Sequence, residues 1–215
     1  MNHKTNKNEA NLETKGRPTE TETSNKAEKE LIDQKVEQND TTMMIESTGT
    51  IALRTIPVYI RNGNRKLQVN ALLDDASTKT YLNADVAAEL GLQGCLRKVN
   101  VSLLNGKVET FETSPVECVI ESLDGKSCSK VTAFTANRVT GNMKVTDWNT
   151  CAKMWPHLKG LPFYKLGSKS TVDVLIGLDC SDLHFSVRDI RGNPGEPVAR
   201  LTPLGWTCVG SMEGQ

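Results

Sequence analysis

Three short turn signals constrain the fold of this 215-residue chain more than any other feature of its sequence. Each lies between two segments rich in Val, Ile, Thr and Phe, and they are Asn62-Gly63, Asn105-Gly106 and Asp124-Gly125. Such dipeptides favour the tight turns of β-hairpins, because asparagine, aspartate and glycine adopt positive φ more readily than other residues. The sequence therefore predicts three hairpins, over residues 51–74, 99–112 and 116–134.

The remaining regular elements are also mostly strands. A continuous apolar run, VDVLIGLD at 172–179, predicts a buried strand, and residues 197–210 predict two strands around a bend at Pro203. The clearest helix signal is short: residues 86–90, with Asn83 or Asp85 as N-cap. About eight strands against one short helix predict an all-β barrel or sandwich.

The chain divides into a polar tail and one domain. Lys, Glu, Asn and Thr dominate residues 1–47, where apolar residues are too sparse to offset the entropy of ordering, so we predict a disordered tail or linker. We predict the folded domain over 48–212. Within it, residues 136–170 are less regular and are interpreted as an insertion that carries Trp148 and Trp155.

Composition excludes several classes of function. Lys+Arg and Asp+Glu are both 26, which argues against a protein that mainly grips nucleic acid. No apolar run is long enough to span a membrane, and the first residues do not form a secretory leader, so we expect an intracellular, cytoplasmic protein. The six cysteines have no zinc-site spacing, and we expect scattered reduced thiols rather than a secreted disulfide framework, with no cofactor or metal.

Two adjacent carboxylates stand directly after an apolar strand, in the stretch ALLDDAST at 71–78. A carboxylate at the end of a buried strand is held in position by the backbone behind it, and the small residues that follow leave room for a ligand. By themselves, Asp74 and Asp75 could also form a solvated turn. Together with Asp179, they could instead form a site for a hard cation such as Ca²⁺ or Mg²⁺.

Three motifs in order carry a resemblance to a known family. ALLDDAST, followed by the helix signal, resembles the active-site loop of retropepsin-type aspartic proteases, and VDVLIGLD resembles their second conserved apolar strand. With TPLGWTCVG at 202–210, the set is most similar to the protease region of BEL/Pao-type retrotransposon polyproteins. The resemblance covers roughly residues 50–212. It implies a retropepsin-like closed barrel with one short helix after the active-site loop.

The resemblance also implies roles for individual residues. They are catalytic Asp74; active-site loop Asp75, Ala76 and Ser77; a substrate-binding flap at Asn105 and Gly106; and structural support from Leu73, Ile176 and Gly177. Asp75 and Ala76 depart from the family pattern, which has Thr or Ser and then Gly at these two positions.

The implied chemistry is hydrolysis of peptide bonds in a polypeptide substrate, such as a retrotransposon polyprotein. Each chain supplies one Asp74, so the implied enzyme is a homodimer in which two carboxylates share one proton and activate a water. Asp75 is not the partner of Asp74, because adjacent residues of an extended segment point in opposite directions. We expect Asp75 either to accept hydrogen bonds from loop N–H groups or to face the other chain. The alternative is a catalytically degenerate β-barrel that dimerises or binds peptide.

Overall fold

The structure is a computed structural model that describes residues 51–102, 106–141 and 143–213. The tail predicted over residues 1–47 lies outside the described residues. The described part is mostly β, with a closed barrel and a short helix after the loop that follows the second barrel strand, as the sequence predicts at this level.

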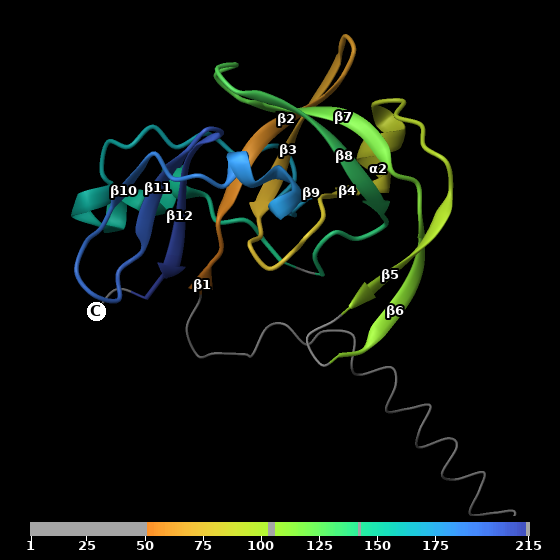
Figure 1. The fold of residues 1–215 in the computed structure, drawn as a ribbon. Coiled ribbons are helices and arrows are strands. Elements are labelled where there is room, and N and C mark those ends of the chain that lie inside the picture. The colour runs from red at the N-terminus through yellow and green to blue at the C-terminus, as the bar shows by residue number, and fades with distance from the viewer. Residues whose placement is uncertain (1–50, 103–105, 142, 214–215) are drawn as a thin grey trace, which may run out of the picture. The chain divides into compact units, whose positions relative to one another are not determined.

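Six strands close the barrel, in the order β2-β3-β9-β4-β8-β7 (Figure 1). They are β2 (Thr55–Asn62), β3 (Arg65–Leu73), β4 (Tyr81–Asn83), β7 (Val116–Ser122), β8 (Cys128–Ala136) and β9 (Val174–Ile176). Alternation places every second residue of β7 inside, so that Val116, Cys118 and Ile120 are buried. These side chains pack with apolar residues of the other strands and of the short helix in one core.

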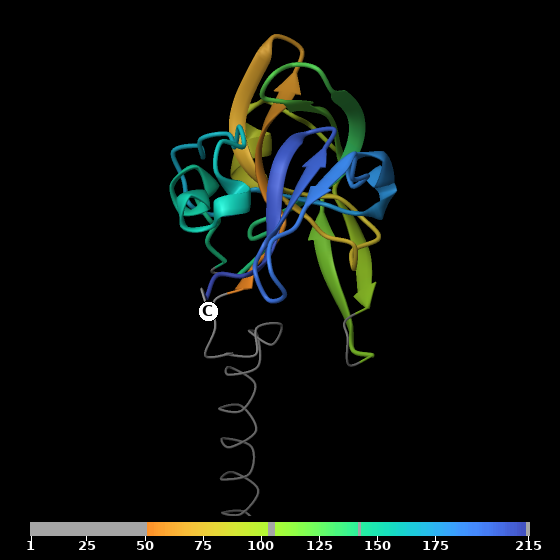
Figure 2. The same ribbon diagram turned by 90° about the vertical axis from the view of Figure 1, so that its left-hand side faces the viewer.

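All three predicted hairpins form, with their strands paired antiparallel. Gly63 and Gly125 have φ of +56° and +71°, the positive values that their turns require. The second hairpin, β5 (Arg97–Ser102) and β6 (Val108–Thr113), is a separate two-stranded sheet. It extends away from the barrel in two perpendicular views (Figures 1 and 2).

The predicted strand over residues 51–60 is interrupted. Ile51–Ala52 forms β1, which pairs with the C-terminal strand, and β2 begins only at Thr55. The strands β10 (Arg188–Ile190), β11 (Val198–Thr202) and β12 (Gly205–Ser211) complete a four-stranded sheet in the order β1-β12-β11-β10. Strand β10 was not predicted, because it has only three residues and no apolar alternation.

Helices are short. Helix α2 (Ala84–Glu89) is N-capped by Asn83, whose side chain accepts hydrogen bonds from two backbone N–H groups. The other helices of the described residues are α3 (Trp148–Cys151), η1 (Ala152–Met154), η2 (Pro156–Leu158) and η3 (Leu178–Leu183). In the described part of the chain, no helix has the length and apolar character that crossing a lipid bilayer requires.

A second apolar cluster lies outside the barrel core. Trp148, Trp155 and Phe163 of the predicted insertion pack with Ala199 of β11 and Cys208 of β12. Trp148 lies 6.0 Å from Trp155 and 6.1 Å from Phe163, measured between ring centroids. The irregular segment therefore covers the C-terminal sheet with aromatic side chains.

Candidate functional site

The candidate loop begins where two apolar strands end side by side. Strands β3 and β9 are parallel, and their last residues Leu73 and Ile176 are register partners. Both side chains are buried, with exposures of 3% and 0%. The N–H of Asp74 donates to the carbonyl of Ile176 at 3.0 Å, which joins the first residue of the loop to the end of β9. The structure thus brings Leu73, Ile176 and Asp74 together.

Gly177 lets the returning loop approach the end of β9. A Cβ at this position would lie 2.4 Å from the backbone oxygen of Lys79 and 2.8 Å from its nitrogen. Cβ atoms do not come this close to backbone, so any larger residue would displace the loop. The backbone of Gly177 is extended (φ −90°, ψ −178°), a conformation that any residue can adopt. The glycine is therefore required because there is no space for a Cβ, and not because of its backbone conformation.

Asp74 is partly exposed and is held by the turn that it starts. Its Oδ1 accepts the N–H of Ala76 at 3.0 Å, and its carbonyl accepts the N–H of Ser77 at 3.4 Å. None of the ion pairs formed between described residues includes Asp74. This carboxylate therefore has a fixed backbone, access to solvent and no cationic partner among the residues that the structure describes.

Asp75 has a different environment. Its Oδ1 lies 2.5 Å from Nη2 of Arg54 and 2.8 Å from Nδ1 of His184. The Arg54 and His184 side chains are 8% and 7% exposed, whereas that of Asp75 is 62% exposed. Desolvation raises the pKa of Asp75, but the hydrogen bonds and charges of Arg54 and His184 outweigh it, so the pKa lies below its usual value of 3.8. We expected Asp75 to accept hydrogen bonds from loop N–H groups or to face the other chain; within its own chain, its donors are the side chains of Arg54 and His184.

His184 also connects the loop to the end of β9. Its Nε2 lies 3.1 Å from the carbonyl oxygen of Gly177, while its Nδ1 faces Asp75. Each ring nitrogen thus faces an oxygen acceptor, and both contacts are hydrogen bonds when the ring carries both protons.

Thr80 closes the loop on its other side. Its buried hydroxyl accepts the N–H of Gly177 at 3.1 Å and donates to Oδ1 of Asp179 at 2.7 Å. The N–H of Thr80 donates to Oδ2 of Asp179 at 3.1 Å. Both oxygens of Asp179 therefore hold the loop in place.

The cation site considered from the sequence does not form. Asp75 and Asp179 are bound by donors of the protein, and no group of three or more His, Cys, Asp or Glu side chains among the described residues is arranged to hold a metal ion. The structure therefore does not bring Asp74, Asp75 and Asp179 together as metal ligands.

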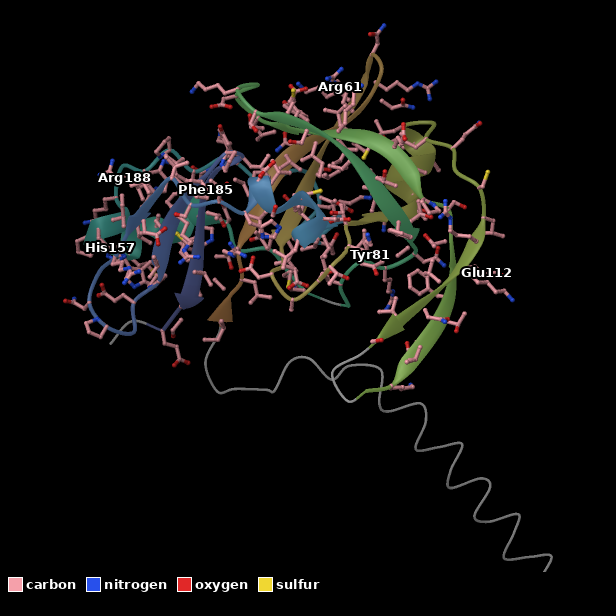
Figure 3. All side chains as sticks on the ribbon, viewed as in Figure 1. Arg61, Tyr81, Glu112, His157, Phe185 and Arg188 are labelled. Atoms are coloured by element: carbon pink, nitrogen blue, oxygen red, sulfur yellow. The ribbon has the colours of Figure 1, made fainter. Side chains whose placement is uncertain are left out.

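The predicted flap is only partly described. Asn105 lies outside the described residues, and Gly106 is exposed with φ +74°. At the barrel end of the hairpin, Phe111 of β6 lies 6.3 Å from Tyr81 of β4, measured between ring centroids; Tyr81 is labelled in Figure 3. The hairpin is therefore anchored beside the strand that directly follows the candidate loop.

A cavity of about 290 Å³ lies in the insertion, lined by residues that include Trp148, Leu158 and Phe163. The candidate loop contributes no residue to its walls.

Sequence reasoning missed Arg54 and His184, and only one of them carried a usable signal. Arg54 interrupts an apolar run, IALRTI, and an arginine that is buried needs an anionic partner. His184 lies 109 residues from Asp75, so nothing local in the sequence indicates their contact.

Comparisons of the chain with protein-family models, with curated proteins and with solved structures found no match.

Proposed function

We propose that this chain is an aspartic endopeptidase of retropepsin type, with a retropepsin-like barrel and Asp74 as its catalytic carboxylate. One observation carries the proposal: an aspartate that is partly exposed, and that pairs with no cation in the described part of the chain, stands at the joined, buried ends of two parallel strands. The N–H of Asp74 is bound to Ile176, and Gly177 leaves space for the loop to fold back. Such rigidity is what a catalytic carboxylate needs, because small errors in position cost large factors in rate.

The proposed reaction needs two copies of Asp74. Two carboxylates about 3 Å apart cannot both ionise, so the pair holds one proton. The ionised member takes a proton from water as the water attacks the scissile carbonyl, and the protonated member donates to the carbonyl oxygen. A proton then passes to the leaving amine. The chain provides one loop of this kind, so the site would lie on a two-fold axis between two chains. The substrate would be a polypeptide, such as the polyprotein from which a retrotransposon protease is released.

Asp75 has a supporting role in this proposal. Arg54 and His184 hold the pKa of Asp75 below its usual value. Asp75 therefore stays ionised at the pH at which the Asp74 pair would exchange its proton. It therefore accepts hydrogen bonds inside its own chain and takes no part in proton transfer.

A second candidate function is a non-catalytic barrel that binds peptide or a second copy. The observation that favours it is the capture of Asp75 by Arg54 and His184. A carboxylate bound in this way cannot donate a hydrogen bond, whereas the Thr or Ser hydroxyl of the resembling family can.

Incubation of the purified protein with a peptide library at about pH 5, with and without pepstatin, tests the proposal. The wild type should cleave peptides, and Asp74→Asn should lose at least about 100-fold in kcat because the pair can no longer share a proton. Asp182→Asn removes an exposed acid of η3, the segment that also carries Asp179, and should keep its activity. Cleavage that is equal in wild type and Asp74→Asn would exclude the catalytic assignment, and peptide binding without turnover would favour the second candidate.

A further inference from the structure

The cavity in the insertion has walls of two kinds, one apolar and one positively charged. The apolar wall belongs to the second apolar cluster, and four of its side chains are buried: Trp148, Ala152, Leu158 and Phe163. The short helices that carry the first three lie beside the C-terminal strands (Figures 1 and 2). Because the rings of Trp148 and Phe163 are packed together, part of this wall is aromatic and suits an aromatic ligand.

The volume of the cavity limits the size of its ligand. It is about 290 Å³, at the lower end of the range for protein sites that bind small molecules. A dry cavity of about 150 Å³ holds one benzene molecule. This cavity therefore has space for about two fused aromatic rings, which favours a compact ligand over a long chain.

The charged wall carries two lysines. Lys153 of η1 and Lys159, the residue after η2, line the cavity, and no described Asp or Glu does. Neither lysine forms an ion pair with a residue that the structure describes. Asp147, the nearest acid in the sequence, caps α3 and accepts hydrogen bonds from the N–H of Asn149 and the hydroxyl of Thr150. The cavity therefore presents positive charge to a ligand.

Trp148 adds a hydrogen-bond donor. The residue is 4% exposed, and its buried indole N–H has no acceptor in the described part of the chain. Buried tryptophans usually find a partner for this N–H, so an unpartnered one on a cavity wall favours a ligand that carries an acceptor. A carboxylate only accepts hydrogen bonds, and it therefore complements both the lysine ammonium groups and an indole N–H.

We propose that this cavity binds a small aromatic carboxylate of about two fused rings, with its rings against Trp148 and Phe163 and its carboxylate beside Lys153 and Lys159. The two parts of the ligand match the two kinds of wall. A small anion without rings would meet only exposed lysines, whose attraction is weakened by solvent. The candidate loop contributes no residue to the cavity, so this inference does not rest on the proposed function.

An NMR titration of the full-length chain with 2-naphthoate at pH 7 tests the proposal. The backbone amides of Gly160 and Leu161 and the indole N–H of Trp148 should shift to saturation, with a dissociation constant of about 1 mM or lower. 2-Naphthalenemethanol keeps the rings without the charge and should bind about three- to tenfold more weakly. Acetate keeps the charge without the rings and should not saturate these signals. No saturable shift with 2-naphthoate, or equal shifts with acetate, would overturn the proposal.

Lys153→Gln/Lys159→Gln tests the charged wall. It should weaken the binding of 2-naphthoate about three- to tenfold and change that of 2-naphthalenemethanol less than about twofold. The matched control is Lys130→Gln/Lys144→Gln, which removes two exposed lysines that do not line the cavity and should bind 2-naphthoate like the wild type. Equal losses in the two double variants would show that net charge, and not this cavity, attracts the anion.

Phe163→Leu tests the aromatic wall. It keeps an apolar side chain but removes the ring, so 2-naphthoate and 2-naphthalenemethanol should both bind about two- to tenfold more weakly. Circular dichroism shows whether this variant folds, and where it does not, the lysine comparison decides. Unchanged affinities in a folded Phe163→Leu would exclude the assignment of the ligand rings to this wall.

Discussion

Asp74 and Asp75 are neighbours in sequence with different surroundings. A backbone N–H of the loop binds Asp74, whereas two buried cationic or polar side chains bind Asp75. The difference arises because Asp75 lies in the turn that Asp74 starts, where its side chain meets Arg54 and His184 while that of Asp74 meets the backbone of the turn. Among the described residues, Asp74 forms no ion pair, whereas Asp75 connects the loop through Arg54 to the segment before β2 and through His184 to the residue after β9.

Asp75 should make the stability of the protein depend on pH in the acid range. Its folded-state pKa lies below its unfolded value of 3.8, so its stabilising contribution is present above that value and is lost as the pH falls through the folded pKa. Asp75→Asn should lower the free energy of unfolding at pH 7, and its difference from wild type should shrink between about pH 5 and pH 2. Urea unfolding of the two proteins at a series of pH values measures the loss of free energy of unfolding at pH 7 and its decrease at acid pH.

Asp182→Asn is the control, because it removes a carboxylate without touching Arg54 or His184. Its difference from wild type should stay small at every pH. If the free energy of unfolding of wild type and of Asp75→Asn differed by the same amount at every pH down to 2, the role assigned to the ion pair would be contradicted.

At the scale of elements, the pairing of β3 with β9 builds the candidate site. The C-terminal half of β3 and the two ends of β9 are buried, and both strands end at the same edge of the barrel, so their parallel register places Asp74 beside Gly177. Thr80 and Asp179 then connect the loop to the turn after β9. The geometry of the site therefore depends on contacts between segments about 100 residues apart.

Gly177→Ala should displace the candidate loop. The added Cβ would lie 2.4 Å from the oxygen of Lys79, so backbone must shift, at a cost of about 1–3 kcal/mol in the free energy of unfolding. Hydrogen exchange at the N–H of Leu178, which is bonded to Ser77, should become faster as the loop moves away. Urea unfolding and amide exchange by NMR measure the two effects.

Gly141→Ala is the matched control, because a Cβ at Gly141 would meet no atom within 4 Å. It should leave both measurements close to wild type. If Gly177→Ala also left the free energy of unfolding and the amide exchange of Leu178 close to wild type, close packing of the loop on β9 would not be the reason for the glycine.

At the scale of the described domain, the two larger of three apolar clusters share one β framework. The barrel encloses the first, and aromatic residues of the insertion cover the C-terminal sheet to form the second. The hydroxyl of Thr207 in β12 donates to the carbonyl of Thr55 in β2 at 2.8 Å, which joins the sheet to the barrel. The insertion is therefore part of the folded domain.

Trp155→Ala should destabilise the whole domain by about 3–5 kcal/mol, because it removes a side chain that is 3% exposed from the second cluster. Trp155→Phe keeps most of the apolar volume and should cost clearly less. Urea unfolding followed by far-UV circular dichroism and by amide NMR signals of the barrel should give coincident transitions. Loss of the second cluster before the barrel would show that the two unfold separately.

Local sequence determined where the three hairpins of this protein form and where their turns lie. Positive φ at Gly63 and Gly125, the alternation of β7 and the cap at Asn83 all follow from neighbours within a few residues. These features were predictable because turn chemistry and side-chain periodicity act over short distances.

Only the tertiary structure decided how those segments meet. Arg54, Asp75 and His184 come from three distant parts of the chain, and only the closed barrel places their side chains in contact. The same closure pairs β3 with β9 in parallel, a choice that no local pattern encodes, because either apolar strand could have paired with several others. The sequence thus indicated Asp74 as a candidate, while long-range packing determined that it is Asp75 that becomes the ion-paired neighbour.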